Sequence, residues 1–156
     1  MIDKKELCAF LVKAKKATYA AGDIAKKIVE ADKSTSLYFD DGDWKYHDNY
    51  FGGEPFGGRE VVFYSGEPVY IMTYYGFIEE SVIDVMPIYG FLQKSLSAIL
   101  DDFPYRGPRT FAENNFEYKN DFDGEVDNFS GEEKIIFKGK AVYRAKYCGG
   151  FVNVRK

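Results

Sequence analysis

The sequence has few of the residues that metal centres and disulfide frameworks require. Its 156 residues include two cysteines, Cys8 and Cys148, and a single histidine, His47. Two cysteines are too few for a disulfide scaffold and are typical of a protein from a reducing cytoplasm. With one histidine and no cysteine cluster, we expect no transition-metal site and no cofactor.

Long apolar runs are also missing. No stretch approaches the roughly 20 apolar residues of a membrane-spanning helix, and residues 1–6 show no apolar signal segment. The formal net charge is −4, so the phosphate backbone of nucleic acid is an unfavourable direct partner. We therefore expect a cytoplasmic protein with no direct contact to nucleic acid or membrane.

Familiar catalytic motifs are absent as well: there is no Gly-x-Ser-x-Gly, Walker loop, dinucleotide fingerprint or His-Glu-x-x-His. What the chain has is apolar residues, at 46%, and an unusual 18% of aromatic residues, which dominate core and interface energetics. The length and composition predict a single globular domain, 1–156.

An internal repeat organises the sequence. Residues 39–76 match residues 111–149 with one inserted residue, and 11 of the 35 aligned pairs are identical, nearly all of them glycine, aromatic or glutamate. Each copy shows the alternation of antiparallel hairpins with one apolar face. Asp41-Gly42 is a hairpin signal, and a two-residue loop there predicts Phe39 opposite Trp44.

Two helices are predicted. Asp3 and Glu6 form a capping box before a stripe of Leu7, Phe10, Leu11 and Ala14, and the lysines Lys13, Lys15 and Lys16 are assigned mostly to the solvated side. A second helix is expected from Pro87 to about Leu100. Residues 17–35 are interpreted as a loop with a short helical turn at 24–28. The predicted fold class is α+β: two pseudo-symmetric α-ββββ halves forming antiparallel sheet packed by helices.

Several motifs together resemble a known family. They are Tyr46-x-Asp48-x-Tyr50-x-Gly52-Gly53-x-x-Phe56-x-Gly58-x-Glu60, Tyr74-Tyr75-Gly76, Tyr105-Arg106-Gly107-Pro108 and Phe129-x-Gly131-x-Glu133. Over about Leu7 to Val152 the chain resembles an uncharacterised bacterial domain family that occurs alone or fused behind a Cro/repressor-type helix-turn-helix domain. The resemblance implies a cytoplasmic bacterial protein with an effector-sensing or interaction role, and the family has no established catalytic residues to carry over to this chain. Phe63 stands where that family often has Trp, and no helix-turn-helix segment is expected in this chain.

Glu60 and Glu133 are the most informative pair of residues. Strand alternation places each on an apolar face, and an inward carboxylate needs partners to stay charged. Tyrosines on the facing strands are candidate donors. One interpretation is structural, with each Glu holding a tyrosine or a backbone N–H; the other is a paired acid site or ligand clamp. Arg106, between prolines, either forms a rigid turn or points at an inward carboxylate or an anionic ligand.

Other polar features are assigned to the surface. His47 alternates toward the polar face, so a solvated histidine is favoured over a general base. The segment 121–127 is predicted as an acidic hairpin turn, because its spacing fails the EF-hand pattern. Between residues 69–75 and 142–148, Ile71 and Thr73 replace Arg144 and Lys146. We expect Ile71, Thr73 and Tyr75 to lie against the N-terminal helix or a partner, and the two cations to be exposed.

The favoured function is a non-enzymatic, small-molecule-binding or effector-sensing module that holds a partly aromatic or cationic ligand in an aromatic-lined groove between the repeats. The alternatives are a hydrolase or isomerase using Glu60 or Glu133, and a homodimeric interaction domain. No catalytic residue and no metal ligand is assigned. The candidate ligand-binding residues are Tyr46, Asp48, Tyr50, Glu60, Tyr74, Arg106, Glu133 and Tyr147.

Overall fold

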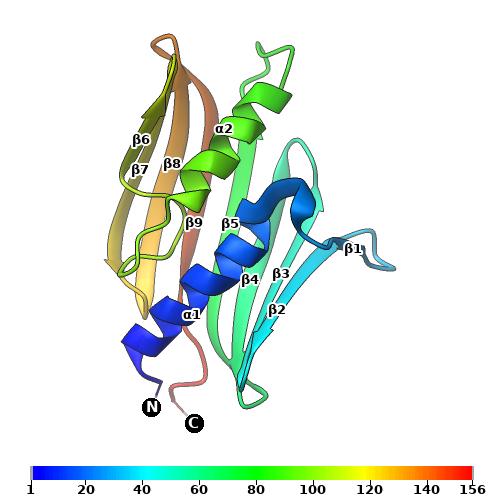
Figure 1. The fold of residues 1–156 in the computed structure, drawn as a ribbon, viewed down its shortest axis with the longest axis vertical. Coiled ribbons are helices and arrows are strands. Elements are labelled where there is room, and N and C mark those ends of the chain that lie inside the picture. Colours follow the sequence, from blue (N-terminus) through cyan, green and yellow to red (C-terminus); the bar gives the residue numbers. More distant parts are fainter. Residues whose placement is uncertain (1, 156) are drawn as a thin grey trace.

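A computed structural model describes residues 2–155 as an α+β fold, in which nine strands form one antiparallel sheet and two helices lie on the same face of it (Figure 1). The elements are α1 (Lys4–Ala17), the 3₁₀ helix η1 (Tyr19–Ile24), β1 (Ile28–Val29), β2 (Thr35–Asp41), β3 (Trp44–Gly52), β4 (Phe56–Tyr64), β5 (Glu67–Ile78), α2 (Met86–Ser97), β6 (Thr110–Glu113), β7 (Phe116–Glu125), β8 (Asn128–Phe137) and β9 (Lys140–Phe151). None of the helices within these residues is long and apolar enough to cross a membrane.

The strand order β1-β2-β3-β4-β5-β9-β8-β7-β6 joins the two hairpin series at the centre of the sheet. β5 and β9 are antiparallel neighbours there, and Tyr74 lies opposite Tyr147. Side chains alternate along β5: Tyr70, Met72 and Tyr74 are buried under the helices, while the residues between them point to the helix-free face. The central strands therefore carry large aromatic side chains into the space below α1 and α2.

Both helices form where the sequence predicts them. The side chain of Asp3 accepts hydrogen bonds from the backbone N–H groups of Lys5 and Glu6, which caps α1 as expected. α2 ends at Ser97, three residues before the predicted end at Leu100. Each helix packs a phenylalanine on the hairpin below it. Phe10 stacks on Trp44 with ring centroids 5.3 Å apart, and Phe91 stacks on Phe116 at 5.1 Å.

Three local predictions are wrong. The predicted helical turn at 24–28 is instead the 3₁₀ helix η1 at Tyr19–Ile24, followed by the short strand β1, which pairs with β2. The β2–β3 register is shifted by two residues, so that Phe39 lies opposite Tyr46 and Asp41 opposite Trp44. Gly42, at φ 62°, is the first residue of the two-residue turn rather than the second. Because the shift is even, every side chain keeps its predicted face.

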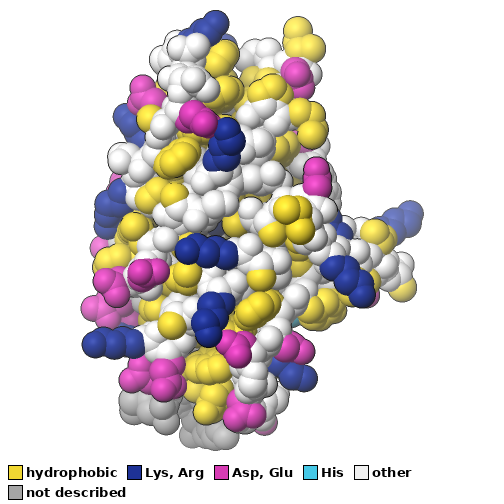
Figure 2. Space-filling model, viewed as in Figure 1, with side chains coloured by type: hydrophobic (Ala, Val, Ile, Leu, Met, Phe, Trp, Pro, Cys, Tyr) yellow, Lys and Arg dark blue, Asp and Glu magenta, His cyan; other side chains and the backbone are white. Residues whose placement is uncertain are grey.

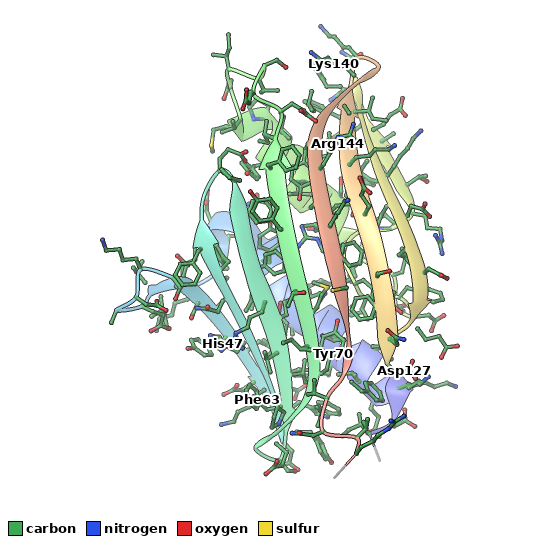
Figure 3. All side chains as sticks on the ribbon, turned by 180° about the vertical axis from the view of Figure 1, so that it is seen from behind. His47, Phe63, Tyr70, Asp127, Lys140 and Arg144 are labelled. Carbon is green, nitrogen blue, oxygen red and sulfur yellow. The ribbon has the colours of Figure 1, made fainter. Side chains whose placement is uncertain are left out.

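The expectation for the cover over β5 names two alternatives, the N-terminal helix or a partner, and the helix alternative is the third wrong prediction. Both helices lie on the opposite face of the sheet, so Ile71, Thr73 and Tyr75 do not contact the N-terminal helix, and Tyr75 is 56% exposed. Figure 3 views this helix-free face, with His47 on β3 and Arg144 near one end of β9. Lys146 is exposed as expected, whereas Arg144 is half-buried and pairs with Glu79 at 3.1 Å. A partner on this face stays a prediction.

The acidic segment 121–127 forms the end of a hairpin, as predicted: Glu125 pairs with Asn128 across the β7–β8 turn. The helix-covered side of the molecule carries Lys and Arg side chains interspersed with Asp and Glu (Figure 2). Charge is therefore spread over this outer surface. The residues that bring several charges close together are buried between the helices and the sheet.

Candidate functional site

A buried polar cluster lies between the helices and the sheet. Each member is buried, with a relative exposure of at most 7%. The members come from α1, from the connection between α2 and β6, and from the strands β3, β4, β5, β7, β8 and β9. They are Lys15, Tyr46, Asp48, Glu60, Tyr70, Tyr74, Arg106, Tyr118, Asn120, Glu133, Tyr143 and Tyr147. Seven of the eight predicted binding residues belong to this cluster; the eighth, Tyr50, is half-buried on β3.

The arginine end of the cluster comprises Arg106, Tyr118, Asn120, Glu133 and Tyr143. Arg106 donates to Glu133 Oε1 from Nε at 3.0 Å and from Nη2 at 2.6 Å. The hydroxyl of Tyr118 donates to Oε2 at 2.5 Å, and that of Tyr143 donates to Oε1 at 2.8 Å. Both carboxylate oxygens are thus engaged. Of the two interpretations of Arg106, the structure shows the one in which its side chain points at an inward carboxylate.

The backbone of the α2–β6 connection completes this end. Gly107 N–H donates to the Tyr118 hydroxyl at 2.9 Å, and Asn120 donates from Nδ2 to Gly107 O at 2.9 Å. A Cβ on Gly107 would lie 2.7 Å from the Tyr118 ring, so glycine permits this approach. Asn120 Oδ1 accepts from the Tyr147 hydroxyl at 2.6 Å. Although burial acts to lower the pKa of Arg106, Glu133 raises it well above the usual value.

The acidic end of the cluster comprises Tyr46, Asp48, Glu60 and Tyr70. Asp48 and Glu60 are direct cross-strand partners on β3 and β4. Asp48 Oδ1 accepts from the Tyr74 hydroxyl at 2.6 Å. Within residues 2–155, four oxygens are buried without a hydrogen-bond partner: Asp48 Oδ2, Glu60 Oε2 and the hydroxyls of Tyr46 and Tyr70. Glu60 Oε2 instead forms an ion pair with Lys15. Two carboxylates and two hydroxyls therefore meet here with few bonds among them.

Lys15 supplies the cation of the acidic end. Its Nζ lies 2.8 Å from Glu60 Oε2 and also donates to the Tyr105 carbonyl. The sequence pattern predicts Lys15 on the solvated side of its helix, and that prediction is wrong, since Lys15 is 6% exposed. The missed signal is its spacing: Lys15 follows Leu7 by eight residues and Leu11 by four, which places it on the buried stripe.

Burial and like charge perturb the titration of these groups. Desolvation, and then the neighbouring Glu60 carboxylate, raise the pKa of Asp48 to about 7. Burial lowers the pKa of Lys15, and Glu60 opposes that shift. Burial and Glu60 raise the pKa of Tyr46 and Tyr70 well above the usual value, so both keep their O–H donors. The pKa of Asp48 therefore lies near neutral pH.

There is little free space at the cluster. A cavity of about 10 Å³ lies among Lys15, Tyr19, Glu60 and Arg106, which is the room of roughly one water molecule. Larger hollows, of about 770 and 920 Å³, lie at the surface near Lys4, and none of the cluster residues lines them. Any ligand larger than water reaches the acidic end only if the covering segments move.

His47 lies away from the cluster. It is half-buried on the helix-free face, stacks on Tyr38 with ring centroids 4.4 Å apart, and shares a 2.9 Å hydrogen bond with the Ser36 hydroxyl. Burial lowers its pKa. Within residues 2–155, no three His, Cys, Asp or Glu side chains gather closely enough to hold a metal ion.

The fold and the site together define an antiparallel α+β domain with a buried cluster of carboxylates, cations and tyrosines. The chain belongs to a family of domains of unknown function, DUF5680, whose model matches residues 48–152. No curated protein and no solved structure matches it. The matched segment includes Asp48, Glu60, Glu133 and Arg106, whereas Lys15 lies outside it.

Proposed function

We propose that the chain is a small-molecule-binding, effector-sensing module whose site is the acidic end of the buried cluster. The observation that supports this most directly is the gathering, among residues 2–155, of four buried oxygens without a hydrogen-bond partner, on Tyr46, Asp48, Glu60 and Tyr70, of which the Glu60 oxygen is ion-paired with Lys15. More than nine in ten buried polar groups are normally bonded, and each unmet one costs about 1–3 kcal/mol. A bound molecule that supplies these bonds would be stabilised by them.

The resemblance to domains found behind helix-turn-helix regulators supports the sensing part of the proposal. In such an arrangement, ligand binding has to change the position of a structural element. The small cavity supports the same requirement, because α1 and η1 cover the acidic end directly. A ligand at Asp48 and Glu60 would therefore be coupled to the packing of the N-terminal helix.

Native mass spectrometry of the purified chain tests for a retained ligand. Thermal melting against panels of amines, carboxylates and nucleosides then tests for binding from solution. We expect a retained mass or a rise in the melting temperature that is lost in Asp48→Asn. His47→Gln is the matched control, since it lies on the opposite face, and it should bind as the wild type does. Binding of no panel compound, with no retained mass, would contradict the proposal.

An acid/base enzyme is the second candidate, and the pKa of Asp48, raised to about 7, favours it, because that value suits proton transfer at neutral pH. Glu133 is engaged by Arg106 and two tyrosines, so this candidate depends on Glu60 and Asp48. Turnover of a bound compound by the wild type, lost in Asp48→Asn with binding retained, would favour the enzyme over the binding module.

A homodimer is the third candidate, favoured by aromatic side chains on the helix-free face: Phe51 and Tyr75 are 52% and 56% exposed. Ile71 lies on the same face of β5. If this face joins two copies, Ile71→Arg should convert a dimer to a monomer in size-exclusion chromatography. A wild-type monomer would remove this candidate without affecting the other two.

We also propose that residues 39–76 and 111–149 are related by an approximate twofold axis. Three observations support this: the sheet extends outward from β5 and β9, the repeat aligns Tyr74 with Tyr147, and these two lie opposite each other. The axis would pass between them. A crystal structure in which the two segments do not superpose strand for strand would contradict this relation.

A further inference from the structure

We infer that the acidic end is a subsite for the ammonium group of a small organic amine, and that Lys15 occupies this subsite as an internal substitute when no ligand is bound. The inference rests on the proposed function and names the chemical class of its ligand. It follows from what Lys15 contacts, what it leaves unsatisfied, and how it differs from Arg106.

Lys15 already places an ammonium group at the acidic end. Its Nζ is 2.8 Å from Glu60 Oε2 and donates to the Tyr105 carbonyl, and the side chain is nine-tenths buried. One N–H of the ammonium group donates to the Tyr105 carbonyl, and its charge pairs with Glu60. A primary amine can take the same position with the same charge, so the subsite is built for that group.

The carboxylates of the acidic end outnumber its cation. Asp48 and Glu60 face each other across β3 and β4, and within residues 2–155 Asp48 Oδ2 has no donor. The hydroxyls of Tyr46 and Tyr70 are donors without acceptors there. A ligand that carries an ammonium group together with a hydrogen-bond acceptor would satisfy both deficits, which Lys15 alone does not.

Arg106 at the other end is not exchangeable in this way. Its guanidinium makes two hydrogen bonds to Glu133, whose oxygens also accept from two tyrosines. Arginine binds carboxylates as a rigid fork, whereas lysine is a point charge on a flexible stem. Lys15 can therefore withdraw from Glu60 at a lower cost than Arg106 can from Glu133.

The cover over Lys15 is thin. Lys15 belongs to the last turn of α1, and the following element, η1, buries only Gly22 among its residues, while Ile24 is 92% exposed. The cavity of about 10 Å³ between Lys15, Tyr19 and Glu60 leaves no room for a second ammonium group. An amine thus enters by displacing the Lys15 side chain, with η1 and the last turn of α1 moving outward.

Chemical rescue of Lys15→Ala tests this inference. The variant removes the internal ammonium group and leaves its space, so its melting temperature should fall by roughly 10 °C. Addition of n-propylammonium chloride at about 100 mM should then raise it by roughly 3 °C, if the dissociation constant is about 10 mM. The rise should saturate and should exceed that in sodium or tetramethylammonium chloride of equal ionic strength.

Two controls isolate the subsite. Lys15→Met fills the space without a charge and should not respond to n-propylammonium, nor should Lys15→Ala combined with Glu60→Gln. If Lys15→Ala does not fold alone, it is refolded from urea with and without the amine, and recovery only with the amine is expected. Equal behaviour in n-propylammonium and sodium chloride, in melting or in refolding, would overturn the inference.

Failure here differs from failure of the proposed function. If n-propylammonium has no specific effect but native mass spectrometry finds a retained uncharged or anionic compound, the module binds a ligand and the amine class is wrong. If n-propylammonium rescues Lys15→Ala but the wild type binds nothing from any panel, the ammonium subsite exists and the binding function is wrong.

Discussion

Glu60 and Glu133 occupy matched positions in the two hairpin series, and both are buried beneath the helices. Counting this pair, the repeat aligns five residues of one end with five of the other, and four of the five are identical, three tyrosines and the glutamate. The fifth is Asp48 at the acidic end and Asn120 at the arginine end. Yet Glu133 has donors on both oxygens, while the hydroxyls of Tyr46 and Tyr70 near Glu60 have no hydrogen-bond partner among the residues that the structure describes.

The cation and the amide account for this difference. Arg106 reaches Glu133 on a connection fixed between prolines, and its fork leaves room for two tyrosine donors. Asn120 donates from Nδ2 to Gly107 O. At the aligned position, Asp48 has an oxygen in place of that N–H group, and within residues 2–155 this oxygen, Oδ2, has no hydrogen-bond partner. Similar residues thus form a fully hydrogen-bonded network at the arginine end and a polar site with unpaired hydrogen-bonding groups at the acidic end.

The largest effect is expected from breaking the arginine end. Glu133→Gln leaves the Arg106 guanidinium buried without its counter-charge, which should lower the free energy of unfolding by about 3–5 kcal/mol. Glu60→Gln should cost less, because the pKa of Lys15 is already lowered by burial and the amine can lose its proton. Urea unfolding at pH 7 measures both, and equal losses would contradict the distinction.

Asp48→Asn converts the acidic end toward the arginine end. The pKa of Asp48 in the fold, about 7, exceeds its unfolded value, so Asp48 contributes stability below about pH 4 that is lost as the pH rises to about 7. Asparagine has no such loss. The variant should therefore exceed the wild type in unfolding free energy by roughly 2–4 kcal/mol at pH 8.

The same pair of proteins supplies the control for this prediction. Below about pH 3 the two curves of unfolding free energy against pH should converge, since Asp48 is then largely protonated in both the folded and the unfolded state. Asn120→Asp should do the reverse and destabilise the fold at pH 8. A constant difference between Asp48→Asn and wild type over the whole pH range would show that Asp48 does not titrate in this window.

Removing single hydroxyls compares the ends at a finer scale. Tyr118→Phe takes a donor from Glu133 and an acceptor from Gly107 N–H, and should cost about 1–3 kcal/mol. Tyr46→Phe removes a hydroxyl that has no partner, and should be neutral or slightly stabilising. Chemical denaturation compares the two, and a larger loss for Tyr46→Phe would mean that its hydroxyl is bonded in the folded protein.

The smallest effect is expected outside the cluster. His47→Ala loses a stacking contact with Tyr38 and a hydrogen bond to Ser36 at a half-buried position, and should cost about 1 kcal/mol or less. Glu60→Gln should exceed this loss. If the melting temperature falls by the same amount in both variants, the buried Glu60 contributes no more to stability than the half-buried His47 does.

Much of this arrangement can be predicted from the sequence. Strand alternation alone places Glu60 and Glu133 inward, and the prolines around Arg106 indicate a fixed side chain near a carboxylate. The helix cap at Asp3 and the acidic hairpin turn at 121–127 follow from local patterns that contain their own partners.

The rest depends on packing that local patterns do not contain. Lys15 is buried because Glu60, 45 residues away in the chain, is there to receive its charge, and lysine is otherwise almost never buried. The unpartnered hydroxyls of Tyr46 and Tyr70 are properties of the assembled site. Alternation along β5 shows that Ile71 and Tyr70 lie on opposite faces of the sheet. It does not show which face the two helices cover, so the helix-free position of Ile71 could not be predicted from it.

The protonation of Asp48 is the most direct measure of the difference between the two ends. Carbon-detected NMR of the side-chain carboxyl groups, titrated in the wild-type protein, should show a midpoint of about 7 for Asp48. In Lys15→Ala, addition of n-propylammonium should lower that midpoint, because it restores a positive charge beside the carboxylates. A midpoint near about 4, the value of an ordinary aspartate, would mean that Asp48 is solvated or paired and that the acidic end is not an unsatisfied site.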